Sequence, residues 1–163
     1  MKRFLAKIWK ALKLPTNLQL FLMRKTQDEF LVGVTGIFFD KKNRVLLFKH
    51  TYRNPAWSLP GGYIKKGEHP KEALEREVME ESGLIVSADQ RIKIRTDRDS
   101  ARLDITYAGV FIGGVFEPSH EVSKYKLFAF DKLPGISQDQ LIFIEKAMNI
   151  LKHYDINRQS LLQ

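Results

Sequence analysis

The chain has 163 residues, of which 44% are hydrophobic and 28% charged, with a net charge of +8 and no cysteine. This is the size and composition of one globular domain. The lack of cysteine excludes a disulfide framework and thiolate zinc sites, and it favours a reducing, cytoplasmic location. No apolar run approaches the ~20 residues that cross a bilayer, and the basic start lacks the uninterrupted apolar stretch of a cleaved signal peptide.

The positive charge is concentrated at the N-terminus. Residues 1–25 contain seven basic residues and no acidic one, which leaves 20 basic and 19 acidic residues, a net charge of +1, for the rest of the chain. A nucleic-acid-binding domain is expected to carry its basic charge on the folded surface itself. The distribution therefore argues against nucleic acid as the partner of the main domain and assigns the basic character to an attached segment.

That segment is predicted to begin with a basic amphipathic helix over residues 3–13. Its apolar residues recur at helical spacing, with lysines on the opposite side: Phe4, Leu5, Ile8, Trp9 and Leu12. Pro15 ends this helix, and Thr16 can cap a second short one. Three roles stay open: packing against the protein's own core or a second subunit of a homodimer, peripheral contact of residues 1–14 with anionic lipid, and contact with a nucleic-acid backbone.

The main domain is predicted to start with a hairpin. Phe30 to Asp40 is strand-like, residues 40–43 form a turn, and Val45 to Lys49 form the second strand. A polar loop from His50 to Pro55 follows.

Three residues in and after this loop are candidate contacts for a nucleotide. Tyr52, Arg53 and Trp57 could stack on or bind one. For Trp57 we favour the alternative, in which the indole packs beneath the loop.

The next helix is predicted between Pro70 and Gly83. Proline suits the first helical position, and glycine can adopt the left-handed conformation that ends a helix. Its apolar residues are few: Ala73, Leu74 and Val78. Three acidic residues, Glu77, Glu80 and Glu81, fall within an arc of about 100°.

This acidic arc has two interpretations. The i, i+4 pair Glu77 and Glu81 costs the helix about 0.2–0.5 kcal/mol, which a solvated acidic face can tolerate. Alternatively the carboxylates bind a hard divalent cation such as Mg²⁺, which takes oxygen ligands and joins carboxylates to substrate phosphates. The clustering alone leaves both open.

Further strands are predicted over Arg91–Arg95, Leu103–Phe116 and Val122–Phe130. The first two flank a charged loop, residues 97–102, in which Arg98 and Arg102 are candidate phosphate contacts.

A terminal helix is predicted from Ser137, which forms a capping box with Gln140, to about Lys152. Its buried stripe comprises Leu141, Ile144, Met148 and Leu151. The last ten residues are expected to fray.

Together these elements predict an α/β protein with a mixed sheet between helical layers. We expect an N-terminal helical segment over residues 1–27, a catalytic domain over 28–155 and a C-terminal tail over 156–163.

The spacing of residues 62–84 resembles the signature of the Nudix (MutT-like) hydrolases, Gx5Ex7REUxEExGU, in which U is aliphatic. Every position matches: Gly62, Glu68, Arg76-Glu77-Val78, Glu80-Glu81 and Gly83-Leu84. At typical residue frequencies a chance match is roughly one in a billion per window. The flanking runs Trp57–Gly62 and Phe130–Pro134 extend the resemblance, which covers about residues 30–152.

The resemblance implies a Nudix-type α/β/α sandwich and a metal-dependent pyrophosphohydrolase. Such an enzyme uses Mg²⁺ or Mn²⁺ to cleave a nucleoside diphosphate linked to another moiety, as in an NDP-sugar, a dinucleotide or a (d)NTP, by attack of water. Glu77 and Glu81 would be the principal metal ligands, Glu80 would complete the cluster, and the Gly61 carbonyl would be the ligand from the loop.

The resemblance also suggests roles for other acidic residues. Glu68 and Arg76 would form an ion pair that braces the helix start against the loop, although Glu68 is alternatively a metal ligand or base. The general base would be a glutamate of the signature or an acid on a later loop, for which Glu121 is the candidate and Glu117 the reserve. The four histidines show no metal-ligand spacing, and His69 occupies a helix-cap position.

The sequence does not identify the substrate. The proline or tyrosine that marks ADP-ribose and diadenosine polyphosphate hydrolases downstream of the signature is absent from residues 99–102. Two other functions stay open. One is an RNA 5′-end pyrophosphohydrolase whose basic segment holds the RNA, and the other is a non-catalytic nucleotide-binding Nudix module.

Overall fold

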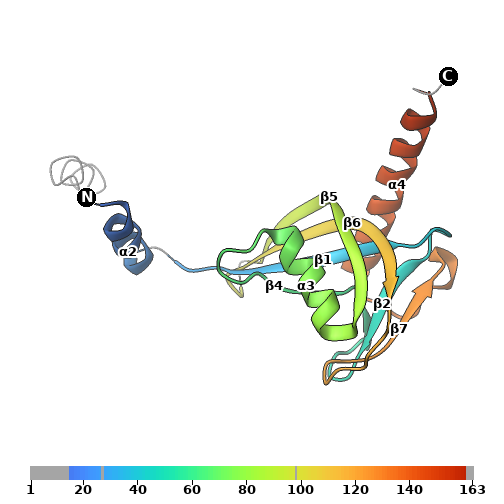
Figure 1. Ribbon diagram of the computed structural model, residues 1–163, viewed down its shortest axis with the longest axis horizontal. Helices are drawn as coiled ribbons and strands as arrows, with labels where there is room; N and C mark the ends of the chain where they lie inside the picture. The colour runs from blue at the N-terminus through green and yellow to red at the C-terminus, as the bar shows by residue number, and fades with distance from the viewer. Residues whose placement is uncertain (1–14, 27, 98, 161–163) are drawn as a thin grey trace. The chain divides into compact units, whose positions relative to one another are not determined.

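The computed structural model describes residues 15–26, 28–97 and 99–160, with side chains described up to residue 150 (Figure 1). The chain divides into two compact units, Met1–Phe30 and Leu31–Gln163. The helix expected over residues 3–13, and with it the membrane contact expected for residues 1–14, lies outside the described residues.

Within the first unit, the expected second short helix is α2 (Thr16–Thr26). The Pro15 carbonyl accepts hydrogen bonds from the N–H groups of Leu18 and Gln19, so Thr16 is the first helical residue rather than the cap. No described residue of α2 is buried. None of the helices in the described parts of the chain is long and apolar enough to cross a membrane.

The second unit is built on a mixed seven-stranded sheet. Its main path runs β3-β2-β1-β6-β5, with β4 paired to β1 and β7 paired to β2. The pairing of β1 with β6 is parallel, and the other pairings are antiparallel. The strands are β1 (Leu31–Phe39), β2 (Val45–His50), β3 (Trp57–Ser58), β4 (Gly61–Tyr63), β5 (Leu84–Asp97), β6 (Arg102–Gly114) and β7 (Val122–Phe128).

The helix of the signature, α3 (Pro70–Ser82), has the predicted boundaries. His69 is its N-cap: the imidazole Nδ1 accepts from the N–H of Lys71, and the Glu72 carboxylate accepts from the N–H of His69. Gly83 ends the helix with φ of 69°, and its N–H donates to the Met79 carbonyl. Local sequence signals therefore fix both ends of this helix.

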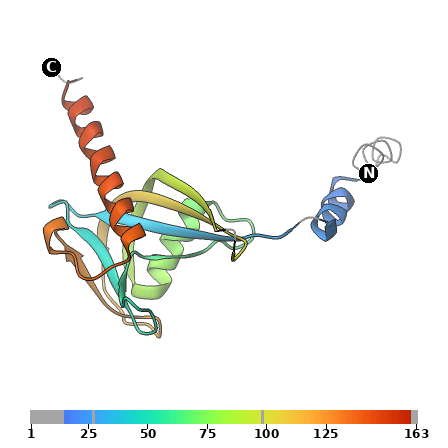
Figure 2. The same ribbon diagram turned by 180° about the vertical axis from the view of Figure 1, so that it is seen from behind.

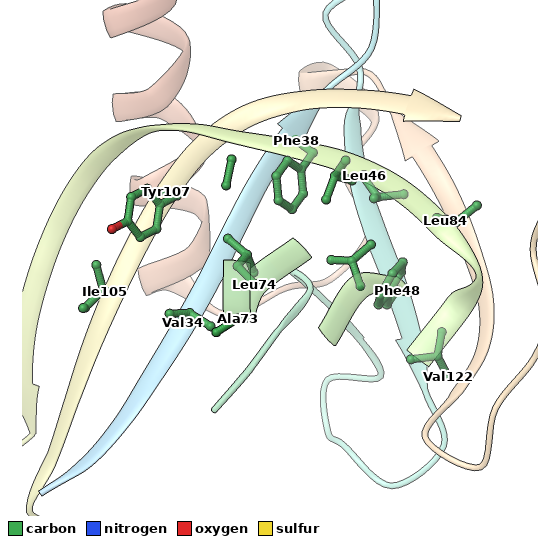
Figure 3. Packing of buried hydrophobic residues seen from close by; sticks show 13 residues of the cluster. Val34, Phe38, Leu46, Phe48, Ala73, Leu74, Leu84, Ile105, Tyr107 and Val122 are labelled. Atoms are coloured by element: carbon green, nitrogen blue, oxygen red, sulfur yellow. The ribbon is translucent and has the colours of Figure 1, made fainter. Parts of the chain in front are cut away.

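Successive residues of each strand point to opposite faces of the sheet, and one helical layer covers each face. Val34 and Phe38 of β1 pack with residues of α3, such as Leu74, in a core that also contains Phe48 of β2 (Figure 3). The alternate residues Ile37 and Phe39 pack with α4 (Gln138–Ser160) through Ile144 and Ala147. Figures 1 and 2 show α3 and α4 on opposite sides of the sheet, which confirms the α/β/α sandwich.

Strand β5 begins at Leu84, directly after α3, and not at Arg91 as predicted. It pairs with β6 from Leu84↔Gly114 to Asp97↔Arg102, with three register shifts along the way. The buried residues Leu84, Val86, Ala88 and Ile92 keep the period-2 pattern through these shifts, but the polar residues between them obscured the first half of the strand in the sequence. Arg102, expected in a loop, is the first residue of β6.

The C-terminal region differs from the prediction in three respects. Strand β7 ends at Phe128, and a short 3₁₀ helix follows at Phe130–Lys132. The Ser137 hydroxyl accepts from the N–H of Gln140 as expected, but the Gln140 side-chain oxygen accepts from the N–H of Leu59, so only half of the capping box forms. Helix α4 continues to Ser160, beyond its expected end, and includes residues 156–160 of the expected tail.

Replacing Gly83 with alanine is expected to destabilise the fold by about 1–3 kcal/mol. Gly83 has a left-handed conformation, and an added Cβ would lie 2.4 Å from the Val115 carbonyl oxygen. Urea unfolding followed by circular dichroism measures the difference. Gly135→Ala is the control, since a Cβ there meets nothing within 4 Å and should change the free energy of unfolding by less than about 0.5 kcal/mol. Equal effects of the two substitutions would contradict the interpretation.

Candidate active site

A glycine pair allows strand β4 to lie close to both β1 and α3. An added Cβ on Gly61 would come within 2.3 Å of the Val34 carbonyl oxygen, and one on Gly62 within 2.3 Å of the Glu77 carboxylate carbon. The carboxylate of Glu77 therefore packs directly on the backbone of Gly62. Any side chain at position 62 would displace it.

Arg76 connects the acidic residues of α3 to the loop before the helix. Its guanidinium donates to both oxygens of Glu68 at 2.6 and 3.0 Å, and to the Tyr63 carbonyl at 3.1 Å. It also donates to Glu77 Oε1 at 2.8 Å and to Glu80 Oε2 at 2.9 Å. The expected Glu68–Arg76 ion pair thus forms, and the same guanidinium holds two further carboxylates.

Glu68 and Glu80 are engaged by additional groups. The N–H of Lys65 donates to Glu68 Oε2 at 2.8 Å, and hydrogen bonding to Arg76 is the main cause that lowers the pKa of Glu68. The Glu80 carboxylate is half exposed and pairs with the Lys65 ammonium at 3.3 Å. Both carboxylates are therefore held in their charged form.

Glu81 is in a different environment. Its Oε2 atom is buried and has no hydrogen-bond partner among the described residues. Burial, followed by the negative charges of Glu121 and Glu77, raises the pKa of Glu81 to about 7. A buried carboxylate beside two others is unfavourable unless a proton or a cation joins it.

The carboxylates do not form a closed metal cage. In the described part of the chain, no group of three or more acidic or histidine side chains converges closely enough to hold an ion. Arg76 holds Glu77 Oε1 and Glu80 Oε2 instead. Even so, the donor set fits a hard cation, because Glu81 Oε2 is unpaired and Glu77 Oε2 lies beside Gly62.

Glu121 lies immediately before β7 and is tied to the loop after β2. Its carboxylate accepts from the Tyr52 hydroxyl at 2.8 Å, and its carbonyl accepts from the N–H of Thr51 at 3.0 Å. Its charge acts on Glu81, so the structure brings the two together from distant parts of the sequence. Glu117 lies at the C-terminal end of α3, where its N–H donates to the Ser82 carbonyl.

A cavity of about 310 Å³ opens beside the glycine pair. Among the candidate substrate contacts, Arg53 and Arg102 both line it. Arg102 is paired with the buried Asp104 at 2.8 Å, whereas the Arg53 guanidinium contacts the Ser58 hydroxyl and the Tyr52 ring. Arg98 lies outside the described residues.

Sequence reasoning missed two polar residues of this cavity, Asp104 and Gln140, which line it together with Thr35. Asp104 had a detectable signal, since it is a lone carboxylate within an apolar strand. A second hollow of about 130 Å³ shares these three residues and adds the N-terminal turn of α4.

Trp57 packs within the protein, which is the interpretation that we favoured over contact with a nucleotide. Its ring meets Phe128 edge to face at 5.1 Å, and it belongs to the core beneath α4. The indole is therefore a structural contact and not part of the cavity lining.

Similarity to known proteins agrees with this fold. The NUDIX domain model matches residues 29–147, so the chain belongs to the Nudix family. The chain is 32% identical over 124 residues to an ADP-ribose pyrophosphatase of Methanocaldococcus jannaschii, covering 72% of each chain. It is 27% identical over 117 residues to an 8-oxo-dGDP phosphatase of Mus musculus, of which it spans 36%.

Solved structures share the fold. A UDP-X diphosphatase matches with a TM-score of 0.68 and 19% identity over 86% of this chain and 73% of that one. An ADP-ribose pyrophosphatase of Streptococcus suis matches with a TM-score of 0.61 and 26% identity over 74% and 92%.

The buried histidine His50 predicts a pH dependence of stability. His50 is 3% exposed, and burial, with the charge of Arg53 second, lowers its pKa to about 4. Between the ordinary pKa of about 6.5 and pH 4 the unfolded chain binds more protons than the folded one. The contribution of neutral His50 to the free energy of unfolding is therefore complete above about pH 6.5, and it is lost as the pH falls toward about 4.

His50→Phe should remove this dependence, so that the variant gains stability relative to wild type as the pH decreases. Urea unfolding at about pH 8, 6 and 4.5 measures the difference, and the value at about pH 8 is the baseline. A difference that stays constant over this range would contradict the prediction.

Proposed function

We propose that the protein is a divalent-metal-dependent pyrophosphohydrolase that cleaves a nucleoside diphosphate linked to another moiety by attack of water. The observation that carries this proposal is the buried Oε2 atom of Glu81, which has no hydrogen-bond partner in the described part of the chain. It lies close enough to Glu77 and Glu121 for their charges to raise its pKa. A cation bound there would remove the cost of the buried charge.

Glu77 and Glu81 would hold Mg²⁺ or Mn²⁺, with Glu80 and the Gly61 carbonyl completing the donor set. The bound ion would neutralise charge on the phosphates and lower the pKa of a water molecule. Arg76 keeps Glu77 Oε2 directed at Gly62 by holding the other oxygen of that carboxylate. Glu77, one of the proposed ligands, thus faces the glycine pair that includes the Gly61 carbonyl.

We assign the general base to Glu121 and a bracing role to Glu68. The Glu68 carboxylate is bonded twice to Arg76, and its lowered pKa makes it a weak proton acceptor. Glu121 comes from a different loop and faces Glu81 from outside the helix. Glu121 can therefore accept a proton from water while the ion pairs of Arg76 with Glu68, Glu77 and Glu80 stay intact.

For the substrate we propose an NDP-sugar of the ADP-ribose type. The relative with 32% identity over 72% of both chains is an ADP-ribose pyrophosphatase. The cavity of about 310 Å³ adjoins Gly61 and Gly62 and lies within the range of small-ligand sites. In this proposal Arg53 contacts the phosphates, while Asp104 and Gln140 offer hydrogen bonds to the base or sugar.

The alternatives gain no support from these relatives. An RNA 5′-end substrate, membrane contact of residues 1–14, homodimer formation and a non-catalytic binding role remain predictions from the sequence. Turnover of triphosphorylated RNA that falls steeply with salt would favour the first. Nucleotide binding without turnover would favour the last.

Glu81→Gln is expected to lower turnover by about 10²–10⁴-fold, because it removes the central carboxylate of the proposed metal site. Release of phosphate or nucleoside monophosphate should be measured from ADP-ribose, other NDP-sugars, dinucleotides, (d)NTPs and triphosphorylated RNA, with Mg²⁺ and with Mn²⁺. EDTA should abolish wild-type turnover, and added metal should restore it.

Glu145→Gln is the matched control for this experiment, because Glu145 is exposed on α4 outside the site. It should behave as wild type. Silence of wild type across the whole panel would overturn the hydrolase proposal and favour a binding module. Turnover by Glu81→Gln at the wild-type rate would overturn the proposed metal site.

Arg53→Ala is expected to raise KM about tenfold with a smaller change in kcat, because a cation that contacts the phosphates contributes binding energy in both ground and transition states. Steady-state kinetics with the panel nucleotide that is turned over fastest measures both constants. Arg91→Ala, at an exposed position of β5 outside the cavity, is the control. Equal KM values for the two variants would exclude the phosphate contact.

A further inference from the structure

Two loops that are far apart in the sequence are fastened to each other at the site. On one side are residues 49–53, the end of β2 and the loop after it, and on the other residues 120–123, the turn before β7 and its first two residues. The N–H of Thr51 donates to the Glu121 carbonyl at 3.0 Å, and the Thr51 hydroxyl donates to the His120 carbonyl at 2.8 Å. The Ser123 hydroxyl donates to the Lys49 carbonyl at 3.0 Å. These bonds fix the backbone of Glu121.

The Glu121 side chain needs a separate constraint, because a carboxylate on a fixed backbone still rotates. Tyr52 supplies it: the phenol donates to Glu121 Oε2 at 2.8 Å. The bond is an O–H donor to an ionised acceptor, a strong class of hydrogen bond.

The ring of Tyr52 is itself positioned by two neighbours. The buried imidazole of His50 meets it edge to face, with 5.9 Å between ring centroids, and His50 in turn meets Phe48 of the core at 6.4 Å. The second neighbour is Arg53, whose guanidinium lies 5.6 Å from the centroid of the Tyr52 ring. Three aromatic rings therefore connect the hydrophobic core to the phenol that holds Glu121.

We propose that Tyr52 is a positioning residue that fixes the Glu121 carboxylate beside Glu81, in the orientation in which Glu121 accepts a proton from the attacking water. This rests on the proposed role of Glu121 as general base. Without the phenol, the carboxylate retains its charge and its backbone position but samples other rotamers. Fewer of these rotamers are productive, so turnover falls while substrate binding is preserved.

Tyr52→Phe tests the proposal, because it removes only the hydroxyl and keeps the ring between His50 and Arg53. We expect kcat to fall about tenfold with KM within about twofold of wild type. The assay uses the nucleotide of the panel that is turned over fastest, in Mg²⁺. Tyr125→Phe is the matched control, because the Tyr125 ring packs against Phe111 and Phe116 and does not line the cavity, and it should leave both constants unchanged.

A double-mutant cycle with Glu121→Gln separates positioning from a general structural effect. If Tyr52 acts through Glu121, adding Tyr52→Phe to Glu121→Gln causes no further loss of kcat. A tenfold loss in both backgrounds, or none in the wild-type background, would overturn the positioning role. A wild-type kcat for Glu121→Gln would overturn both the positioning role of Tyr52 and the role of Glu121 as general base. The turnover of Glu81→Gln would still test the metal-dependent hydrolase independently.

Discussion

The site depends on a single guanidinium. Arg76 binds Glu68, Glu77 and Glu80 and also the carbonyl of Tyr63, the last residue of β4. One cation thus stabilises an arc of carboxylates that would otherwise repel each other on the same helix face. It leaves Glu81 Oε2, one turn beyond Glu77 on α3, without a hydrogen-bond partner among the described residues, and we propose that a metal ion binds at this buried carboxylate. Arg76 thus determines which carboxylates of the acidic face are ion-paired and which one stays without an ion pair among the described residues.

The sequence allowed prediction of those parts of the site whose signals are local. Pro70 and Gly83 delimit α3, and the spacing of its glutamates is sufficient to place them on one face. The sandwich itself follows from the continuous apolar runs of β1 and β2, which are buried on both faces, and from the stripe in α4. Strand β5 was recognised only in part, although its buried residues alternate regularly from Leu84 to Ile92; only its three register shifts with β6 depend on a partner that no single window of sequence contains.

Contacts across long sequence separations were the main part that sequence reasoning could not supply. Gln140 was read as half of a capping box, but its side chain instead binds the N–H of Leu59 before the glycine loop. Glu121 was named from resemblance, yet its partner Tyr52 lies 69 residues away. Asp104 is an intermediate case. Residues two apart lie on the same face of a strand, so the sequence identifies Arg102 as a candidate partner of Asp104. The sequence also marks Asp104 as an unusual polar residue in an otherwise apolar strand.

The parallel pairing of β1 with β6 has a consequence for how the protein folds. Residues 31–39 align with residues 102–110, and everything between them, including the acidic helix, belongs to the loop that this pairing closes. Closing so long a loop costs entropy before any of its contacts form, and folds dominated by such contacts form slowly. Helix α3 can form early from its own caps, but the cavity walls that contain Asp104 and Gly33 come together only when the sheet does. The ends of the acidic helix are therefore specified by local sequence, whereas the cavity beside it depends on the pairing of β1 with β6.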